Sequence, residues 1–172
     1  MTAEGNPAAG QLWQSLAPLR SWQPQEIGPS GYSDHLAVLA WLVFTLRPQQ
    51  GIGLGIGQGV AYFALCQAVR DAGLDARLFG IGQWRTQQAG AQVPEALRDH
   101  NQQHYAAFSR LISADPDGAA DIFDFGGIDL LLVDQDLSPA LLGTLASRWV
   151  PLMSERGVIV LRGLTAACED GA

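Results

Sequence analysis

The feature that most constrains the fold is a short, mainly apolar segment in the C-terminal third of the chain. Residues 128–133 read IDLLLV and are bounded by Gly127 and Asp134. A run of this length between turn residues is typical of a strand that is buried on both faces of a parallel sheet. Such a strand needs a layer of helices on each side, so the segment favours an α/β fold.

The rest of the chain alternates apolar segments with segments of helical period. A strand, a glycine turn and a helix are expected over 51–72, and a further helix, capped by Ser33 or Asp34, precedes them. Further strands are expected over 77–81, 108–113 and 157–161, and further helices over 93–107, 119–125 and 138–151. Strands and helices that alternate at this spacing form a parallel sheet with right-handed crossovers. The predicted fold is therefore a doubly wound, mainly parallel sheet with helices on both faces.

Composition excludes several classes of function. All ten basic residues are arginine, and 17 acidic residues give a net charge of −7, which argues against nucleic acid or an anionic membrane as partner. Without lysine the chain has neither Schiff-base chemistry nor a P-loop. The apolar stretch 36–46 is too short to span a bilayer, and the N-terminal sequence has no signal-peptide pattern. Two cysteines suggest no disulfide framework, so we expect a cytoplasmic protein.

The segment GIGLGIGQG at 51–59 is the strongest candidate for a binding site. Its glycines let the backbone turn tightly and let a ligand approach, and the next helix offers its first N–H groups. No register of the segment satisfies GxGxxG, so a dinucleotide site is not predicted. The alternative is that these glycines serve only close packing of strand and helix.

Two other patterns are weaker. His100 and His104 lie one helical turn apart, but HNQQH lacks a glutamate and a third ligand, so a solvated helix face and no metal site are expected. Cys66 falls within an apolar helix face, where a buried structural thiol is expected.

Five segments carry a resemblance to a known family: LRPQQGIGLGIGQGVAYFALCQAV, LFGIGQW, HNQQHYAAFSRLI, GGIDLLLVDQDLSPALL and ERGVIVLRG. Their order and spacing resemble the class I S-adenosylmethionine-dependent methyltransferases. More narrowly, they are similar to methyltransferase domains fused to, or encoded beside, bacterial glycosyltransferases. The resemblance covers residues 33–163. It implies a Rossmann-like methyltransferase domain over 33–172, truncated after its fifth strand, which follows an irregular lead-in over 1–32.

The resemblance also implies a cofactor site beyond the carboxyl ends of the strands, where ligands of doubly wound sheets bind. In it Asp115 would accept a hydrogen bond from an adenine amine, Trp84 would stack on a ring and Asp134 would lie over the glycine turn. The alternatives are that Asp115 caps a turn, that Trp84 is core and that Asp134 accepts backbone N–H groups. The implied residues are Gly53, Gly55, Gly57, Gly59, Gly82, Gln83, Trp84, Asp115 and Asp134.

Several positions depart from the family pattern. Gly53 matches the acid that helps to hold the methionine amino group, and Gly82 matches the acid that binds the ribose hydroxyls. Loss of two carboxylates could weaken cofactor binding about 100-fold or more. Where the family has HIDGxHxY, this chain keeps the aspartate as Asp134 and has Leu132 and Leu137 in place of the two histidines. The His-Asp pair that ends the fifth strand in the family is replaced by Arg162-Gly163.

These departures predict a degenerate methyltransferase-like domain, a pseudoenzyme that serves as a binding or docking module in bacterial glycan assembly. S-adenosylmethionine binding would be weakened or lost. One alternative is an active S-adenosylmethionine-dependent O-methyltransferase acting on a sugar or other small molecule, with Asp134 or Asp136 as base. Another is a nucleotide-binding regulator without catalysis. An uncovered sheet edge would expose apolar surface, so a glycosyltransferase, another protein or a second copy is the expected partner.

Overall fold

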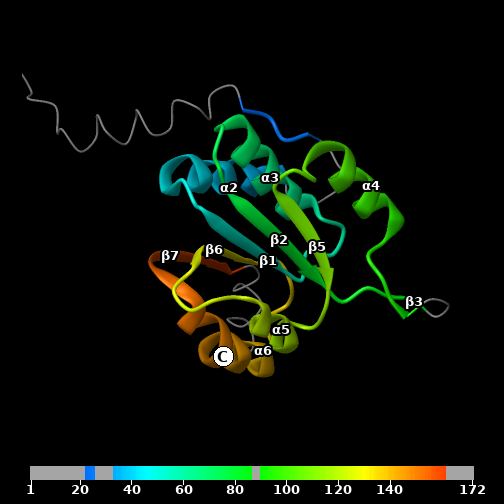
Figure 1. Ribbon diagram of the computed structural model, residues 1–172, viewed down its shortest axis with the longest axis vertical. Coiled ribbons are helices and arrows are strands. Elements are labelled where there is room, and N and C mark those ends of the chain that lie inside the picture. The colour runs from blue at the N-terminus through cyan, green and yellow to red at the C-terminus, as the bar shows by residue number, and fades with distance from the viewer. Residues whose placement is uncertain (1–21, 26–32, 87–89, 162–172) are drawn as a thin grey trace, which may run out of the picture.

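The computed structural model describes residues 22–25, 33–86 and 90–161, and these residues form a five-stranded parallel sheet between layers of helices (Figure 1). The strand order is β5-β2-β1-β6-β7. The central strand β1 (Gln50–Leu54) pairs with β2 (Arg77–Gly82) on one side and β6 (Ile128–Val133) on the other. The outer strands are β5 (Ser109–Ser113) and β7 (Met153–Leu161). Strand order thus reverses between β1 and β6, which confirms the predicted doubly wound sheet.

Helices cover both faces of this sheet. One face carries α2 (Ser33–Leu46), α3 (Val60–Asp71) and α4 (Glu95–His104). The other carries α5 (Pro116–Ala119), α6 (Pro139–Thr144) and the short helices η2 (Ala120–Ile122), η3 (Leu145–Trp149) and η4 (Val150–Leu152). None of the helices in the described part of the chain has the length and hydropathy to cross a bilayer.

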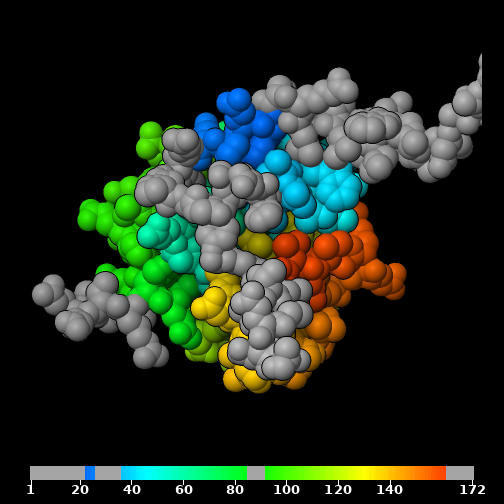
Figure 2. All heavy atoms as spheres, turned by 180° about the vertical axis from the view of Figure 1, so that it is seen from behind, coloured from blue at the N-terminus to red at the C-terminus, as the bar shows by residue number. Residues whose placement is uncertain are grey.

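The side chains of the sheet alternate between two cores. Leu130 and Leu132 pack in the core with α2 and α3, whereas Leu131 and Val133 pack in the core with α6 and η3. This alternation is the reason that a strand buried on both faces has an apolar sequence. Viewed from behind, the atoms of β7 lie at the surface beside those of α2 (Figure 2).

Several elements differ from their predicted bounds. The helix expected over 119–125 begins at Pro116, because Asp115 accepts hydrogen bonds from the backbone N–H groups of Asp117 (3.1 Å) and Gly118 (2.9 Å). Strand β7 begins at Met153 rather than 157. A small ribbon of β3 (Arg85–Thr86) and β4 (Gly90–Ala91) has no predicted counterpart.

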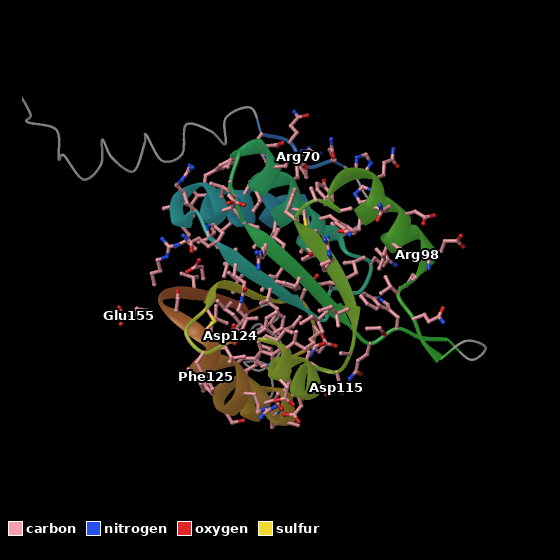
Figure 3. All side chains as sticks on the ribbon, in the orientation of Figure 1. Arg70, Arg98, Asp115, Asp124, Phe125 and Glu155 are labelled. Carbon is pink, nitrogen blue, oxygen red and sulfur yellow. The ribbon has the colours of Figure 1, made fainter. Side chains whose placement is uncertain are left out.

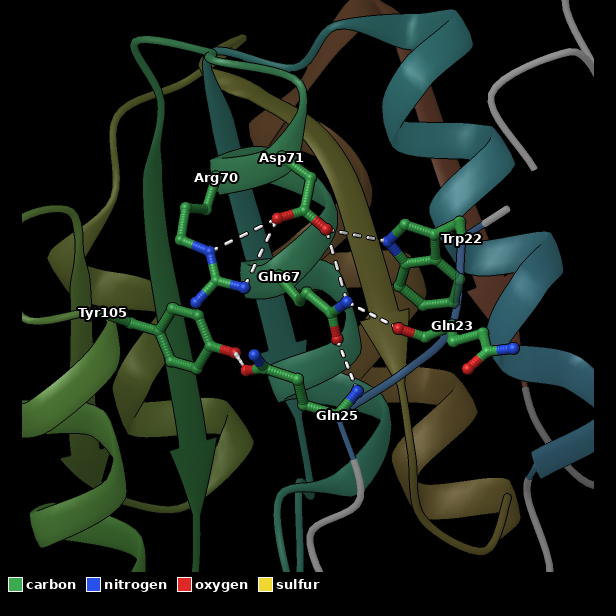
Figure 4. A network of polar contacts seen from close by, with 7 residues as sticks. All are labelled: Trp22, Gln23, Gln25, Gln67, Arg70, Asp71 and Tyr105. Carbon is green, nitrogen blue, oxygen red and sulfur yellow. Dashed lines mark hydrogen bonds and ion pairs between the residues drawn. The ribbon is translucent and has the colours of Figure 1, made fainter. Parts of the chain in front are cut away.

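Part of the predicted lead-in lies along α3 (Figure 4). The amide of Gln67, only 5% exposed, accepts from the N–H of Gln25 (2.7 Å) and donates to the carbonyl of Gln23 (2.7 Å). This side-chain amide pairs with the backbone much as a neighbouring strand would. The indole of Trp22 donates to Asp71 (3.1 Å). Residues 22–25 are thereby held on the helical layer, and the rest of 1–32 lies outside the described residues.

A buried charge at the amino edge of the sheet joins three segments. Asp129, which interrupts the apolar run of β6, is 6% exposed and accepts from the N–H of Gln49 (2.7 Å) and the hydroxyl of Ser154 (2.7 Å). The Arg156 guanidinium donates to both of its oxygens (3.1 and 3.2 Å). Burial acts to raise the pKa of Asp129, but these donors outweigh it and lower the pKa to about 2. The carboxylate therefore links β6 to β7 and to the start of β1.

Replacing Asp129 by Asn should lower the free energy of unfolding at pH 7 by about 1–3 kcal/mol, because it removes charged hydrogen bonds. The pKa in the folded state is about 2, below the ordinary 3.8, so this stabilisation is present above pH 3.8 and is lost as pH falls through 2. Urea unfolding of the two proteins should therefore converge in that range. Asp124→Asn, an exposed carboxylate in the loop before β6, is the control. Equal stability of Asp129→Asn and the parent at pH 7 would contradict the role assigned to this carboxylate.

Candidate functional site

The carboxyl ends of β1, β2 and β6 meet at one edge of the sheet. The N–H of Gly55 donates to the carbonyl of Ile81 (2.8 Å), and the N–H of Asp134 donates to that of Leu54 (2.8 Å). The structure therefore brings together the segments in which the sequence predicts a site: 53–59, 82–84, 114–115 and 134–136. The predicted pair Arg162-Gly163 lies outside the described residues.

The glycine turn between β1 and α3 requires glycine at three alternate positions. Gly55 (φ 68°), Gly57 (φ 49°) and Gly59 (φ 83°) adopt left-handed backbone conformations that other residues rarely adopt. Helix α3 begins directly after them, at Val60, and Gly59 is its N-cap. The predicted order of strand, glycine turn and helix is confirmed.

The side chain of Gln135 covers the first glycine of this turn. A Cβ atom added at Gly55 would lie 2.3 Å from its Oε1 and 2.5 Å from its Cβ. Gln135 lies within the predicted segment 134–136 but is not named among the predicted site residues. The available signal was its position between Asp134 and Asp136, directly after the most buried strand.

The indole of Trp84 covers the end of β2. Its Nε1 donates to the carbonyl of Gly57 (3.0 Å), and a Cβ added at Gly82 would lie 2.6–2.9 Å from its six-membered ring. Trp84 thus joins the second strand to the glycine turn, at the site edge of the sheet and partly exposed. The indole also packs against the core beneath α3, in partial agreement with the alternative interpretation of Trp84 as core, and its stacking on a ligand stays a prediction.

Gly53 lies under the glycine turn and faces the helical layer. A Cβ at this position would lie 2.8 Å from Ile56 and 2.9 Å from Tyr62. Any larger residue here, including the acid of the family pattern, would have to displace both side chains. This close approach matches the alternative that glycine serves packing of strand and helix, and cofactor binding by Gly53 stays a prediction.

Asp115, labelled in Figure 3, follows β5 at this edge of the sheet and is exposed, and Gln83, which directly follows β2, is also exposed. The Asp115 carboxylate is the N-cap of α5 and accepts two backbone N–H groups. This geometry matches the alternative interpretation of Asp115 as a cap. An adenine contact by Asp115 remains a prediction.

Two carboxylates follow β6. Asp134 is partly buried, and burial raises its pKa to about 6. Asp136 is exposed in the same loop. A carboxyl group with a pKa near 6 can accept a proton close to neutral pH, which is the property expected of a general base.

Replacing Asp134 by Asn should raise the free energy of unfolding at pH 7.5 by about 1 kcal/mol, because the buried carboxylate is disfavoured in its charged form. The expected change in the free energy of unfolding is smaller than the pKa shift alone would give, because solvent still reaches the Asp134 carboxylate and screens its charge. The pKa in the folded state, about 6, lies above the ordinary 3.8, so stability present below pH 3.8 is lost as pH rises through 6. Unfolding of both proteins from pH 4 to 8 measures this, with Asp136→Asn as control. A constant difference between the Asp134→Asn variant and the parent across this range would contradict it.

The two weaker sequence patterns, the histidine pair and Cys66, lie on α4 and α3 rather than among the predicted site segments. The His100 ring contacts Phe63 edge-on (centroids 4.7 Å apart) and His104 (4.7 Å), so His100 lies against the core and only His104 is exposed, contrary to the expected solvated face. Burial, with the charge of His104, lowers the pKa of His100. The described residues contain no cluster of three metal-binding side chains.

Cys66 is fully buried, and burial raises its pKa to about 12, as expected for a structural thiol.

Several solved structures that share this architecture are described as methyltransferases. A candidate caffeoyl-CoA O-methyltransferase from Staphylococcus aureus has a TM-score of 0.61 at 13% identity, covering 88% of this chain and 65% of its own. An O-methyltransferase from Streptomyces achromogenes involved in tomaymycin synthesis, solved with S-adenosylmethionine, has a TM-score of 0.59 at 16% identity, covering 92% and 66%. An S-adenosylhomocysteine-bound methyltransferase from Podospora anserina gives 0.58 at 14%, covering 94% and 72%. The fold is thus the Rossmann-like methyltransferase fold, as predicted.

The sequence itself shows the family. The family described as Methyltransferase domain matches residues 52–161, more than half of the chain. This chain belongs to that methyltransferase family. The uncharacterised protein y4gI of Sinorhizobium fredii is 32% identical over 143 residues, which are 80% of this chain but only 16% of that protein. The chain therefore spans a small part of this longer relative.

Proposed function

We propose that this domain is a degenerate S-adenosylmethionine-dependent methyltransferase that has lost catalysis and serves as a binding or docking module. The observation that carries the proposal is the position of two side chains. Trp84 lies over Gly82 and donates to the carbonyl of Gly57, while Gln135 lies over Gly55. Both occupy the edge of the sheet at which ligands of this fold class bind.

The residues at this edge do not fit the cofactor that the family implies. An acid at position 82 would meet the indole, and an acid at position 53 would meet Ile56 and Tyr62. Without these two carboxylates, the methionine ammonium and the ribose hydroxyls lose their charged acceptors. The Asp115 carboxylate is already used as a helix cap. We therefore derive no methyl-transfer step from this site.

A docking role accounts for two further observations. Ile122, Phe125 and Val150 are 50–82% exposed on the described surface, and Figure 3 shows Phe125 in the loop before β6. The relative from Sinorhizobium fredii is several times longer than the matched region, so the domain there is part of a larger protein. A glycosyltransferase in bacterial glycan assembly is the partner that the sequence resemblance implies.

One observation favours a second function, an active O-methyltransferase acting on a sugar or other small molecule. Asp134 lies beside the glycine turn, and burial raises its pKa to about 6. Such a carboxylate can take a proton from a hydroxyl group. In this alternative Asp134, or the exposed Asp136, is the base.

Calorimetric titration of the full chain with S-adenosylmethionine and, separately, S-adenosylhomocysteine separates the two functions. We expect no heat and no thermal stabilisation with either ligand at about 1 mM, because the site lacks the two carboxylates. A ligand present at 100 times its Kd would stabilise the folded state by about 2.7 kcal/mol, so binding would be detected. Micromolar binding would overturn the degenerate site. The Asp134→Asn variant would then be assayed for methyl transfer, with Asp136→Asn as its matched control.

A double-mutant cycle tests the position of Trp84 over Gly82. Gly82→Ala should cost about 1–3 kcal/mol, because its Cβ would overlap the indole. In a Trp84→Ala background the same change should cost less than half as much. The control is Gly143→Ala, where a Cβ meets nothing within 4 Å and whose effect should not depend on Trp84. Equal costs of Gly82→Ala in both backgrounds would refute the contact.

A further inference from the structure

A cavity of about 370 Å³ lies between α4 and the edge strand β5. Its polar lining comprises Arg98, Asn101, Gln102, Ser109 and Arg110. Ser109 and Arg110 begin β5 and pair in register with Leu78 and Phe79, at the amino end of the sheet. None of the lining residues belongs to the glycine turn or to the other predicted site segments, so the cavity is distinct from the candidate cofactor site.

The helical wall of the cavity follows from residue spacing. Arg98, Asn101 and Gln102 are three and four residues apart on α4, so they share one face of the helix. Figure 3 shows Arg98 on α4. Asn101 is held in place because its Oδ1 accepts from the hydroxyl of Ser109 (2.6 Å) and its Nδ2 donates to the Ser109 carbonyl (3.3 Å). The Asn101 part of the polar wall is therefore fixed by β5, whereas Arg98 and Gln102 are exposed.

The charge of the cavity is positive in a chain whose net charge is −7. Arg110 donates through Nη1 to the carbonyls of Ala106 and Ser109, and among the described residues no carboxylate forms an ion pair with it. Arg98 approaches Asp99 only to 3.8 Å, in an exposed pair that contributes little. No lining residue is acidic. Arg98 and Arg110 thus line the cavity, and among the described residues their only ion pair is the exposed one between Arg98 and Asp99.

We propose that this cavity binds a small molecule through an oxyanion, a phosphate or a carboxylate, held between Arg98 and Arg110. Planar guanidinium groups match the geometry of these anions. The exposed amide of Gln102 is available to the rest of the molecule, while the Asn101 amide is bonded to Ser109. The volume lies at the lower end of the range for small-molecule sites, so the ligand is the size of a single metabolite.

The test uses the full chain and inorganic phosphate, observed by 31P NMR at constant ionic strength set with sodium chloride. We expect saturable broadening of the phosphate signal. Arg98→Gln and Arg110→Gln should each weaken the apparent affinity at least tenfold. Arg47→Gln makes the same charge change at an exposed position outside the cavity and should leave affinity unchanged. Arg98 is exposed, so the Arg98→Gln variant keeps the test decisive even if Arg110→Gln fails to fold.

Competition distinguishes the two kinds of oxyanion. Relief of the broadening by citrate would identify a site that accepts carboxylates as well as phosphate, whereas persistence would identify a phosphate site. Absence of broadening, or equal affinity of the Arg98→Gln variant and the parent, would overturn the proposal. These outcomes are independent of whether S-adenosylmethionine binds at the glycine turn.

Discussion

The structure depends on the double pairing of β1. This strand is hydrogen-bonded to β2 on one side and to β6 on the other, and both of its faces are covered by helices. Its polar backbone groups are satisfied by these neighbours, so the chain can leave the sheet only at its end. The exit must turn at once into α3, which requires the left-handed conformations of Gly55 and Gly59. The candidate site lies at this turn because the topology brings the neighbouring strand ends to the same edge.

The same edge shows how the glycine turn of this fold is combined with side chains from neighbouring segments. The glycine turn and Asp134 lie at this edge, where Trp84 packs over Gly82 and Gln135 packs over Gly55. Glycine in these positions leaves room for a side chain of the same protein just as it would leave room for a ligand. A glycine pattern therefore indicates close approach without identifying the group that approaches.

Polar groups elsewhere have roles set by location. At the amino edge, Asp129 is buried among donors, which lower its pKa and make it a structural link between strands. At the carboxyl edge, burial raises the pKa of Asp134 to about 6. On α4 and β5, Arg98 and Arg110 line a cavity whose lining includes neither Asp129 nor Asp134. Identical residue types thus acquire different chemistry from burial and from the donors around them.

Local pattern was sufficient for the order of strands and helices, the glycine turn and the position of Asp134 after β6, because apolar periodicity and turn residues act over short ranges. It also identified Cys66 as a buried thiol. It failed at Pro116, where a proline taken for a turn begins a helix, and at His100, which packs against Phe63 from another helix.

Only the tertiary structure decided that Gln135 lies over Gly55, that Trp84 lies over Gly82 and that Asp129 meets Arg156. These contacts join side chains from different elements, and their geometry depends on how the strands pair and pack.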